Sequence, residues 1–326
     1  MRHVVIGVLL VVLAVIPAEA GKKYSYIRVG NPADAVVATT PGFVLMGGGT
    51  DVDAAFQWMC GRSVGGDFLI VRATGTDAYN AYVQQLCPGV NSVATLIVPT
   101  SSAATDPFVA ATLRNAEAIW IAGGDQSDYI TQWKGTPVQV ELDAAIERGV
   151  PVGGTSAGMM VLTQFVYSAL LSQGVTSSQA LADPFTKYLT LDRDFVSIGL
   201  LAGIVGDSHF VTRDRMGRTL AFMCRTAAAG WTLAPRAIAV DEETALEIDG
   251  GGIAAVVGNG KAYFLRAIQP AEICQPKTPL TYSNVDVYRV GVGGTFDLAM
   301  WSGGGGAAYQ VSATAGVLSS TAASIY

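Results

Sequence analysis

Short apolar segments, three of which run directly into glycines, are the feature that most restricts how this chain can fold. Segments with helical spacing of apolar residues separate them, and this alternation of buried strands and helices is typical of βαβ units. We therefore expect an α/β fold with a mostly parallel central sheet flanked by helices. The expected strands are residues 42–46, 68–71, 92–99, 118–122 and 150–152, and the expected helices are residues 53–62, 77–86, 107–115 and 137–148.

The pattern changes after residue 195, where short strands separated by glycine-containing turns replace the alternation. The expected strands are residues 237–240, 244–248, 254–257 and 261–266, and a late hairpin is expected over residues 295–301 and 308–313, around the four glycines 303–306. We expect an α/β catalytic domain over residues 21–285, which includes added C-terminal strands. A glycine-rich β extension over residues 286–326 is expected to pack on the same domain.

The first twenty residues have the pattern of a secretory signal peptide. Arg2 precedes an apolar stretch over residues 4–16, and small residues then lead to a cleavage position after Ala20. The apolar stretch is shorter than the roughly 20 residues that a membrane-spanning helix needs. We expect a signal peptide over residues 1–20 and a secreted protein, extracellular or periplasmic, without membrane attachment after cleavage.

Removal of such a signal would leave one histidine, His209, because His3 would be lost with it. Four cysteines would enter an oxidising compartment, where one or two disulfides are expected and three full pairings are open: Cys60, Cys87, Cys224 and Cys274. With one histidine and no CxxC pair, we expect no metal site and no cofactor. The formal net charge of −6 argues against a nucleic-acid partner.

Residues 154–158 match the pattern G-x-S-x-G, with Ser156 at its centre. The pattern lies between an expected strand and an expected helix over residues 159–171, at the sheet edge where ligands bind in such folds. In this context the glycines permit a strained turn that presents the serine hydroxyl as a nucleophile. A glycine-rich loop with an ordinary serine is the alternative.

A serine nucleophile requires a base, and a histidine base in the mature chain must be His209. A serine–lysine pair is the rival arrangement, but no lysine lies near Ser156 in the sequence. The third member should be an acid, and its identity stays open at this point. The candidates are Asp241, Glu242 and Glu243 after an expected strand, and Asp183, Asp192 and Asp194 between the serine and the histidine.

Three arginines follow His209 closely: Arg213, Arg215 and Arg218. On a helix the second and third would share a face, with the first roughly 200° from the second. They form either a clamp for a substrate carboxylate or a solvated basic surface. Asp125 and Gln126, after the Gly123–Gly124 pair, could hold an amide or amine of a substrate, or could cap the next helix.

Four motifs in this order resemble cyanophycinase and its relatives, which are serine peptidases related to the aspartyl dipeptidases and have a fold like the class I glutamine amidotransferases. The motifs cover residues 123–126, 154–158, 207–218 and 241–246. The resemblance spans about residues 40–270. It implies Ser156 as nucleophile, His209 as base and Glu242 as acid.

The resemblance also implies an oxyanion hole made by the backbone N–H groups of Ala157 and of a residue near Gly124. It implies that the substrate site is lined by Gln126, Asp207, Arg213, Arg215 and Arg218, to which we add Asp125 and Ser208. Cyanophycinases have glutamine where this chain has Ser208. The shorter side chain changes what the pocket can contact.

We therefore expect a secreted serine-type peptidase that cleaves aspartyl or β-aspartyl peptide bonds, with a peptide or a cyanophycin-like polymer as its partner. A homodimer is one open form of assembly. Two other functions stay open: a secreted carboxylesterase of the α/β-hydrolase type, and a non-catalytic protein that binds anionic ligands on the same fold. The esterase would need its acid between Ser156 and His209 in the sequence.

Overall fold

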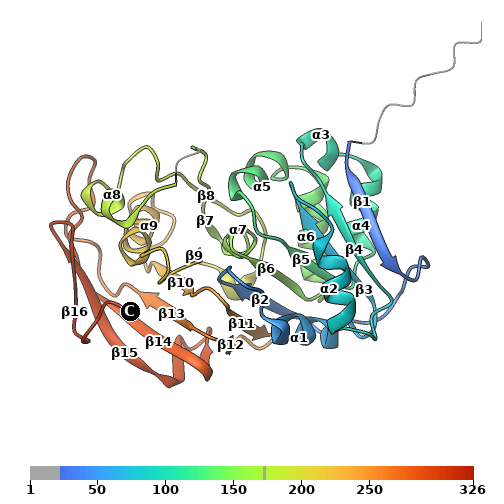
Figure 1. Cartoon of the computed structure of the whole chain (residues 1–326). Coiled ribbons are helices and arrows are strands. Elements are labelled where there is room, and N and C mark those ends of the chain that lie inside the picture. The colour runs from blue at the N-terminus through green and yellow to red at the C-terminus, as the bar shows by residue number, and fades with distance from the viewer. Residues whose placement is uncertain (1–22, 172–173) are drawn as a thin grey trace, which may run out of the picture.

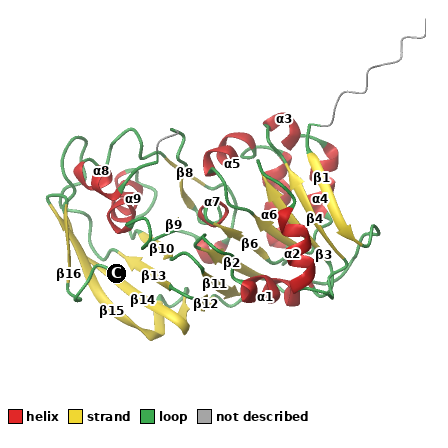
Figure 2. Ribbon diagram, viewed as in Figure 1, coloured by secondary structure: helices red, strands yellow, loops and turns green. Residues whose placement is uncertain are grey.

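The computed structural model describes residues 23–171 and 174–326, so the expected signal peptide lies outside the described residues. Strands β1 to β16 of this part of the chain belong to one continuous sheet. Figure 1 shows helices α1 to α6 around the strands of the first half of the chain, whereas β10 to β16 lie mostly apart from helices. The same division appears in Figure 2, where strands dominate the C-terminal half.

The first half of the chain contains most of the α/β alternation. Its strands are β1 (Ser25–Gly30), β2 (Gly42–Met46), β3 (Asp67–Arg72), β4 (Ser92–Ile97), β5 (Ala118–Ile121) and β6 (Val152–Thr155). Its helices are α1 (Asp53–Ser63), α2 (Ala78–Leu86), α3 (Ser101–Ala104), α4 (Pro107–Arg114), α5 (Gln126–Gln132), α6 (Pro137–Glu147) and α7 (Ala157–Met160).

The second half is rich in strands. They are β7 (Phe165–Tyr167), β8 (Leu191–Arg193), β9 (Ile204–Asp207), β10 (Arg236–Val240), β11 (Thr244–Asp249), β12 (Ile253–Gly258), β13 (Lys261–Arg266), β14 (Tyr282–Asp297), β15 (Ser302–Thr314) and β16 (Val317–Ser320). Its helices are α8 (Ser177–Ala182), the 3-10 turn η1 (Gly199–Leu201) and α9 (Met216–Ala228).

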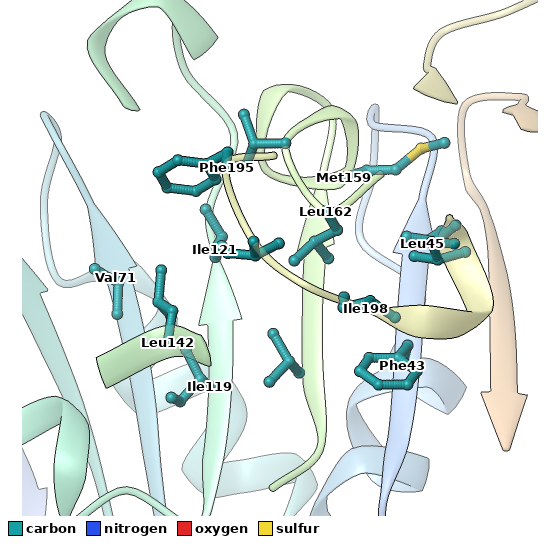
Figure 3. Packing of buried hydrophobic residues seen from close by; sticks show 14 of the residues in the cluster. Phe43, Leu45, Val71, Ile119, Ile121, Leu142, Met159, Leu162, Phe195 and Ile198 are labelled. Atoms are coloured by element: carbon teal, nitrogen blue, oxygen red, sulfur yellow. The ribbon is translucent and has the colours of Figure 1, made fainter. Parts of the chain in front are cut away.

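Strands buried on both faces explain the apolar segments of the first half. In β3, Leu69 and Val71 pack in one cluster with α4 and α6, whereas Phe68 and Ile70 pack in another with α1 and α2. The period of two along a strand sends alternate side chains to opposite faces, so a strand covered on both sides is apolar throughout. Figure 3 shows the first of these clusters, where Ile119, Ile121 and Leu142 meet.

The expectation of an α/β fold is confirmed, but the expectation of a mostly parallel sheet is wrong. The order β4-β3-β5-β6-β2 is parallel throughout, whereas β11 joins β2 in antiparallel fashion and begins a run of antiparallel pairs. The physical reason is the length of the connections. The turn of residues 250–252 joins the sheet neighbours β11 and β12 and is too short for a parallel crossover, and β14 then lies antiparallel between β12 and β13.

The helix expected over residues 159–171 is also wrong. Helix α7 ends at Met160, and residues 165–167 form β7, which pairs with β8 and β9. The buried hydroxyl of Thr163 accepts a hydrogen bond from the N–H of Gly206 in β9, at 2.9 Å. The aromatic and β-branched residues of β7 favour a strand, and the tertiary contact with β9 takes precedence over the helical spacing.

The late hairpin is present, but the glycines do not form its turn. Residues 303–306 lie inside β15, opposite β14, and the turn falls at residues 298–301. A Cβ atom on Gly303 would collide with the ring of Tyr288, so the strand needs glycine where this aromatic ring covers it. The domain boundary expected at residues 285–286 falls inside β14, which pairs with both β12 and β13.

Two disulfides settle the pairing that the sequence leaves open. Cys60 of α1 bonds to Cys87 at the end of α2, and Cys224 of α9 bonds to Cys274, which precedes β14. The Cα atoms are 6.1 Å and 6.2 Å apart in the two pairs, as disulfide geometry requires.

Among the helices of the described residues, none is long and apolar enough to cross a membrane.

Candidate active site

Ser156 stands between β6 and α7 in a strained turn. Its backbone has φ of 53° and ψ of −115°, which residues other than glycine rarely adopt. Neighbouring glycines let the turn close, because a Cβ atom on Gly158 would collide with the backbone of Ile121 and one on Gly154 with that of Gly158. The turn therefore has the strand–elbow–helix form that the G-x-S-x-G spacing predicts, with the hydroxyl at the carboxyl edge of the sheet.

Two hydrogen bonds connect Ser156 to a carboxylate through His209. The Oγ of Ser156 lies 2.7 Å from Nε2 of His209, and Nδ1 of His209 lies 2.5 Å from Oε1 of Glu242. His209 comes from the loop after β9, and Glu242 from the turn between β10 and β11. A neutral imidazole that donates Nδ1–H to the carboxylate has Nε2 free to accept the serine proton.

The glycine turn after β2 holds His209 and the residue next to Glu242. The carbonyl of Gly47 accepts a hydrogen bond from the N–H of His209 at 2.7 Å, and the carbonyl of Gly48 accepts one from Glu243 at 2.8 Å. Gly48 has φ of 95°, and a Cβ atom there would collide with the His209 ring. Only glycine therefore lets the imidazole reach Ser156 past this turn.

The three aspartates between the serine and the histidine in the sequence bind other groups. Asp192 pairs with Lys134 at 2.5 Å, and Asp194 accepts a hydrogen bond from Gln164 at 2.9 Å. Asp183 accepts a backbone N–H at 2.9 Å. The arrangement that an α/β-hydrolase esterase would need, with its acid from this segment, is therefore not formed.

The neighbours of Glu242 are also engaged elsewhere. The carboxylate of Asp241 accepts backbone N–H groups of Val211 and Lys261, and burial raises its pKa to about 6. Glu243 accepts hydrogen bonds from Thr50 at 3.2 Å and from Asn259 at 3.1 Å. Of the candidate acids, Glu242 is the one that contacts His209, as the family resemblance implies.

Burial and nearby charges keep His209 neutral at ordinary pH. Burial lowers the pKa of His209, its hydrogen bond to Glu242 raises it, and the positive charges of Arg213 and Arg215 lower it again, with a net lowering. The hydrogen bond from His209 lowers the pKa of Glu242. The pair therefore consists of an ionised carboxylate and a neutral imidazole, the state in which a histidine can accept a proton.

Asp207, at the end of β9, forms a buried ion pair with Arg218 of α9. The guanidinium contacts both carboxylate oxygens, at 2.8 Å and 2.5 Å, and the hydroxyl of Thr219 donates a third hydrogen bond at 2.9 Å. Burial alone would raise the pKa of Asp207, but Arg218 and Arg215 outweigh it, so the pKa lies below its usual range. The resemblance implies that Asp207 lines the substrate site, but its side chain is fully buried.

A cavity of about 290 Å³ opens beside Ser156. Most of the expected site residues line it: Gly124, Asp125, Gln126, Ser156, Ser208, Arg213, Arg215 and Arg218. Five further lining residues were missed: Met160, Tyr167, Ala169, Leu171 and Gly174. All five lie in or just beyond the segment that the sequence presents as a helix, so no local pattern could have assigned them to the site.

Asp207 offers one negative charge to two arginines, Arg218 and Arg215, so the three arginines keep an excess of positive charge over this carboxylate. Arg215 is largely buried, donates to the carbonyl of Ser208 at 2.8 Å, and approaches Asp207 only to 3.4 Å. Burial lowers its pKa to about 10, so it stays charged at neutral pH. The side chain of Arg213 is 54% exposed and comes no closer than 4.0 Å to Glu242. Among the charged residues that line the cavity, the three arginines thus outnumber the one acid, Asp125.

The loop after β5 brings another backbone segment to the serine. A Cβ atom on Gly123 would lie 3.5 Å from Cβ of Ser156. Asp125 accepts a hydrogen bond from the N–H of Ser127 at 2.9 Å and so caps α5, one of the two roles considered for it. Gln126 donates to the carbonyl of Tyr167 at 3.1 Å and ties this loop to β7.

The three arginines do not share one helix, although their spacing was considered on a single helix. Helix α9 begins at Met216, so Arg213 and Arg215 belong to the loop before it and only Arg218 is helical.

Within the described residues, no group of three or more His, Cys, Asp or Glu side chains is arranged to hold a metal ion.

Sequence comparison places these residues among known proteins. The model of peptidase family S51 matches residues 44–256, which include Ser156, His209 and Glu242. The chain is 27% identical over 195 residues to the cyanophycinase of Trichormus variabilis, covering 58% of this chain and 60% of that protein. It is 25% identical over 201 residues to the cyanophycinase of Synechococcus elongatus, covering 61% and 55%. The matched region thus spans less than two thirds of these relatives.

Structural comparison agrees on the fold. A crystal structure of a peptidase from an acI-B1 Actinobacterium superposes with a TM-score of 0.52 at 17% identity, covering 80% of this chain and 98% of that one. At this identity the likeness concerns the fold alone. The family match covers more than half of the sequence and contains the four motifs that resemble the cyanophycinases. The chain therefore belongs to peptidase family S51.

Proposed function

We propose that this protein is a secreted serine peptidase that hydrolyses aspartyl or β-aspartyl peptide bonds. The observation that carries the proposal is the hydrogen-bonded chain from Ser156 through His209 to Glu242, beside a cavity lined by three arginines. Membership of a peptidase family and relatives that are named cyanophycinases support hydrolysis of a peptide or of a cyanophycin-like polymer. Secretion rests on the signal-peptide pattern of residues 1–20.

The geometry suits acyl transfer. His209 takes the proton of the Ser156 hydroxyl as its oxygen attacks the scissile carbonyl, and Glu242 stabilises the imidazolium that forms. His209 then gives the proton to the leaving amine, and an acyl-enzyme remains on Ser156. Water, deprotonated by the same histidine, cleaves the ester and frees the serine.

The backbone near Ser156 suits the oxyanion. Ala157 is the first residue of α7, and the first N–H groups of a helix have no partner inside it. We assign this N–H and one near Gly124 to an oxyanion hole, where two preorganised donors would stabilise the tetrahedral intermediate. The neighbouring loop lies close enough to contribute, as the position of Gly123 beside Ser156 indicates.

The arginines suit an acidic substrate. Asp207 occupies Arg218, whereas Arg213 and Arg215 leave guanidinium donors at the cavity for a carboxylate. An aspartyl residue bound through its β-carboxyl retains a free α-carboxylate, and an α-linked one retains a free β-carboxylate. Either group could form a charge-assisted pair with the arginines next to the reacting bond.

Replacing Ser156 with alanine should abolish hydrolysis and leave the fold intact, because the hydroxyl contributes chemistry and little packing. We expect a loss of at least about 10⁴-fold in kcat. Turnover of isoaspartyl dipeptides and of β-Asp-Arg polymer measures the loss, and labelling of the intact protein by a serine-directed phosphonate identifies the residue. Activity of Ser156→Ala within about tenfold of the wild type would contradict the assignment.

Glu242 and Glu243 form a matched pair for testing the acid. Glu242→Gln removes the carboxylate that accepts from His209, and we expect kcat/KM to fall by about 10²- to 10⁴-fold. Glu243→Gln changes a carboxylate that contacts Thr50 and Asn259 instead, and should alter kcat/KM by less than about threefold. A larger loss for Glu243→Gln than for Glu242→Gln would place the acid one residue further along.

Activity should fall at acid pH, with a midpoint below the usual histidine pKa of about 6.5. Protonated His209 cannot accept the serine proton, so kcat/KM rises as pH increases through the histidine pKa and then levels off. Arg213→Gln removes a positive charge that lowers this pKa, and should move the midpoint to higher pH. Arg148→Gln, an exposed change directly after α6, should leave the midpoint in place. A flat profile between about pH 4 and 8 would exclude a histidine base.

Amidation of the free carboxylate of the substrate should reduce kcat/KM by about 10- to 1,000-fold, the loss of one charge-assisted pair worth roughly 1.5–4 kcal/mol. In the Arg213→Gln variant the same amidation should matter much less, because one partner of the pair is already missing. Rates for both substrates with both proteins complete a double-mutant cycle. An equal effect of amidation in the two proteins would show that Arg213 does not bind this group.

A further inference from the structure

The loop that carries His209 and two of the arginines is held in an unfavourable backbone conformation. His209 has φ of 47° and Asp214 also has φ of 47°, values at which residues with side chains are uncommon. The loop begins at the reacting histidine and ends at Arg215, directly before α9. Such conformations persist only where surrounding contacts stabilise them, so the contacts around Asp214 determine where the loop lies.

One of these contacts comes from 110 residues further along the chain. The hydroxyl of Tyr326 accepts a hydrogen bond from the N–H of Met216 at 2.9 Å and donates one to the carboxylate of Asp214 at 2.7 Å. Met216 is the first residue of α9, and the side chain of the preceding residue, Arg215, makes no capping hydrogen bond at this end of the helix. Tyr326 therefore satisfies a backbone donor that the helix leaves unpaired.

The ring of Tyr326 reaches the same loop from the side of the sheet. It packs edge-on against Phe210, the residue after His209, with ring centroids 5.4 Å apart, and against Tyr263 of β13 at 6.2 Å. The hydroxyl of Tyr309 in β15 holds the carbonyl of Ile325 at 2.9 Å and so fastens the segment to the sheet. In Figure 1 the label C marks the end of the chain near α9 and β13.

A second hydroxyl holds Asp214 through its backbone. The Oγ of Ser177 in α8 donates to the carbonyl of Asp214 and accepts from the N–H of Arg218 at 3.2 Å. Asp214 is thus bound through its side chain by Tyr326 and through its main chain by Ser177. The left-handed residue between Arg213 and Arg215 is therefore held in position, and with it the backbone from which these two side chains project.

We propose that Tyr326 is a positioning residue for the reaction, which sets the place of His209 and of the two loop arginines by holding Asp214, Met216 and Phe210. The proposal rests on the proposed function of Ser156. Tyr326 is not among the residues that line the cavity, so it acts through the loop. It also lies outside residues 44–256, the part that the family model matches, so the motif residues depend on a contact from outside their own segment.

The test uses the full chain with Tyr326→Phe, which removes the hydroxyl and keeps the ring. We expect Ser156 to react with a serine-directed phosphonate about 5- to 30-fold more slowly, since two hydrogen bonds that hold the loop are lost. Tyr288→Phe is the matched control, because its hydroxyl also accepts a backbone N–H, that of Gly306 at 2.9 Å, and does not contact the loop. The control should react at the wild-type rate.

Asp214→Asn tests the same connection from the other side. Asparagine keeps an acceptor oxygen but loses the charge, so it weakens the hydrogen bond that Tyr326→Phe removes. The two effects should therefore be non-additive in the double variant. A melting temperature of Tyr326→Phe close to that of the control variant would separate a change of loop position from a general loss of stability. A labelling rate for Tyr326→Phe within about twofold of the wild type would overturn the proposal.

A second measurement keeps the proposal distinct from the proposed function. The NMR titration of His209, assigned by the signal that is missing in His209→Gln, reports the surroundings of the imidazole without any turnover. We expect its midpoint in Tyr326→Phe to move upward, because a loosened loop is less buried. If wild-type Ser156 is not labelled, the proposed function fails. Separately, a midpoint of His209 in Tyr326→Phe that stays within about 0.1 pH unit of the wild-type value would overturn the positioning role.

Discussion

Two backbone hydrogen bonds to the glycine turn after β2 are the constraint on which the site depends. The N–H groups of His209 and Glu243 bind the carbonyls of Gly47 and Gly48, so the base and the residue next to the acid Glu242 are placed by main chain on main chain. Side-chain packing could tolerate a shift of an ångström, but such a shift would break the hydrogen bond to Ser156. Since a Cβ atom at Gly48 would meet the imidazole, the absence of a side chain there is part of the geometry.

The charges around the cavity follow from one buried carboxylate. Isolated charges at the depth of Asp207 and Arg218 would be costly, and each offsets the other through two short hydrogen bonds. Asp207 is then fully occupied, which leaves the positive charge of Arg213 and Arg215 available to an acidic ligand. Removing either partner of the buried pair would leave an uncompensated charge next to the loop of His209, so the pair supports both the packing of α9 and the polarity of the cavity.

Helices α1, α2, α4 and α6 and the strands of residues 237–266 were predictable because apolar segments end there at glycine, proline or polar residues, whereas the short helices α3 and α5 were not predicted. Ser156, His209 and Glu242 could be predicted from spacing, elimination and family resemblance, and they lie together. The sequence could not show that β7 is a strand, because its partner β9 is distant in sequence. For the same reason, Tyr167 and its neighbours were not predicted to line the cavity. The burial of Asp207 depends on Arg218, eleven residues further along, for which the sequence offered a substrate clamp or a solvated surface and not a buried partner.

The pairing of β2 with β11 joins the two halves of the sheet, and the serine and its partners come from opposite sides of this junction. Ser156 follows β6 on one side, whereas His209 and Glu242 follow β9 and β10 on the other. A chain in the course of synthesis exposes its serine long before the strands that supply the base and the acid exist. During that interval the hydroxyl is as inert as any other serine. In the proposed mechanism, Ser156 would therefore gain its base and its acid only after residues on both sides of the β2–β11 junction have come together.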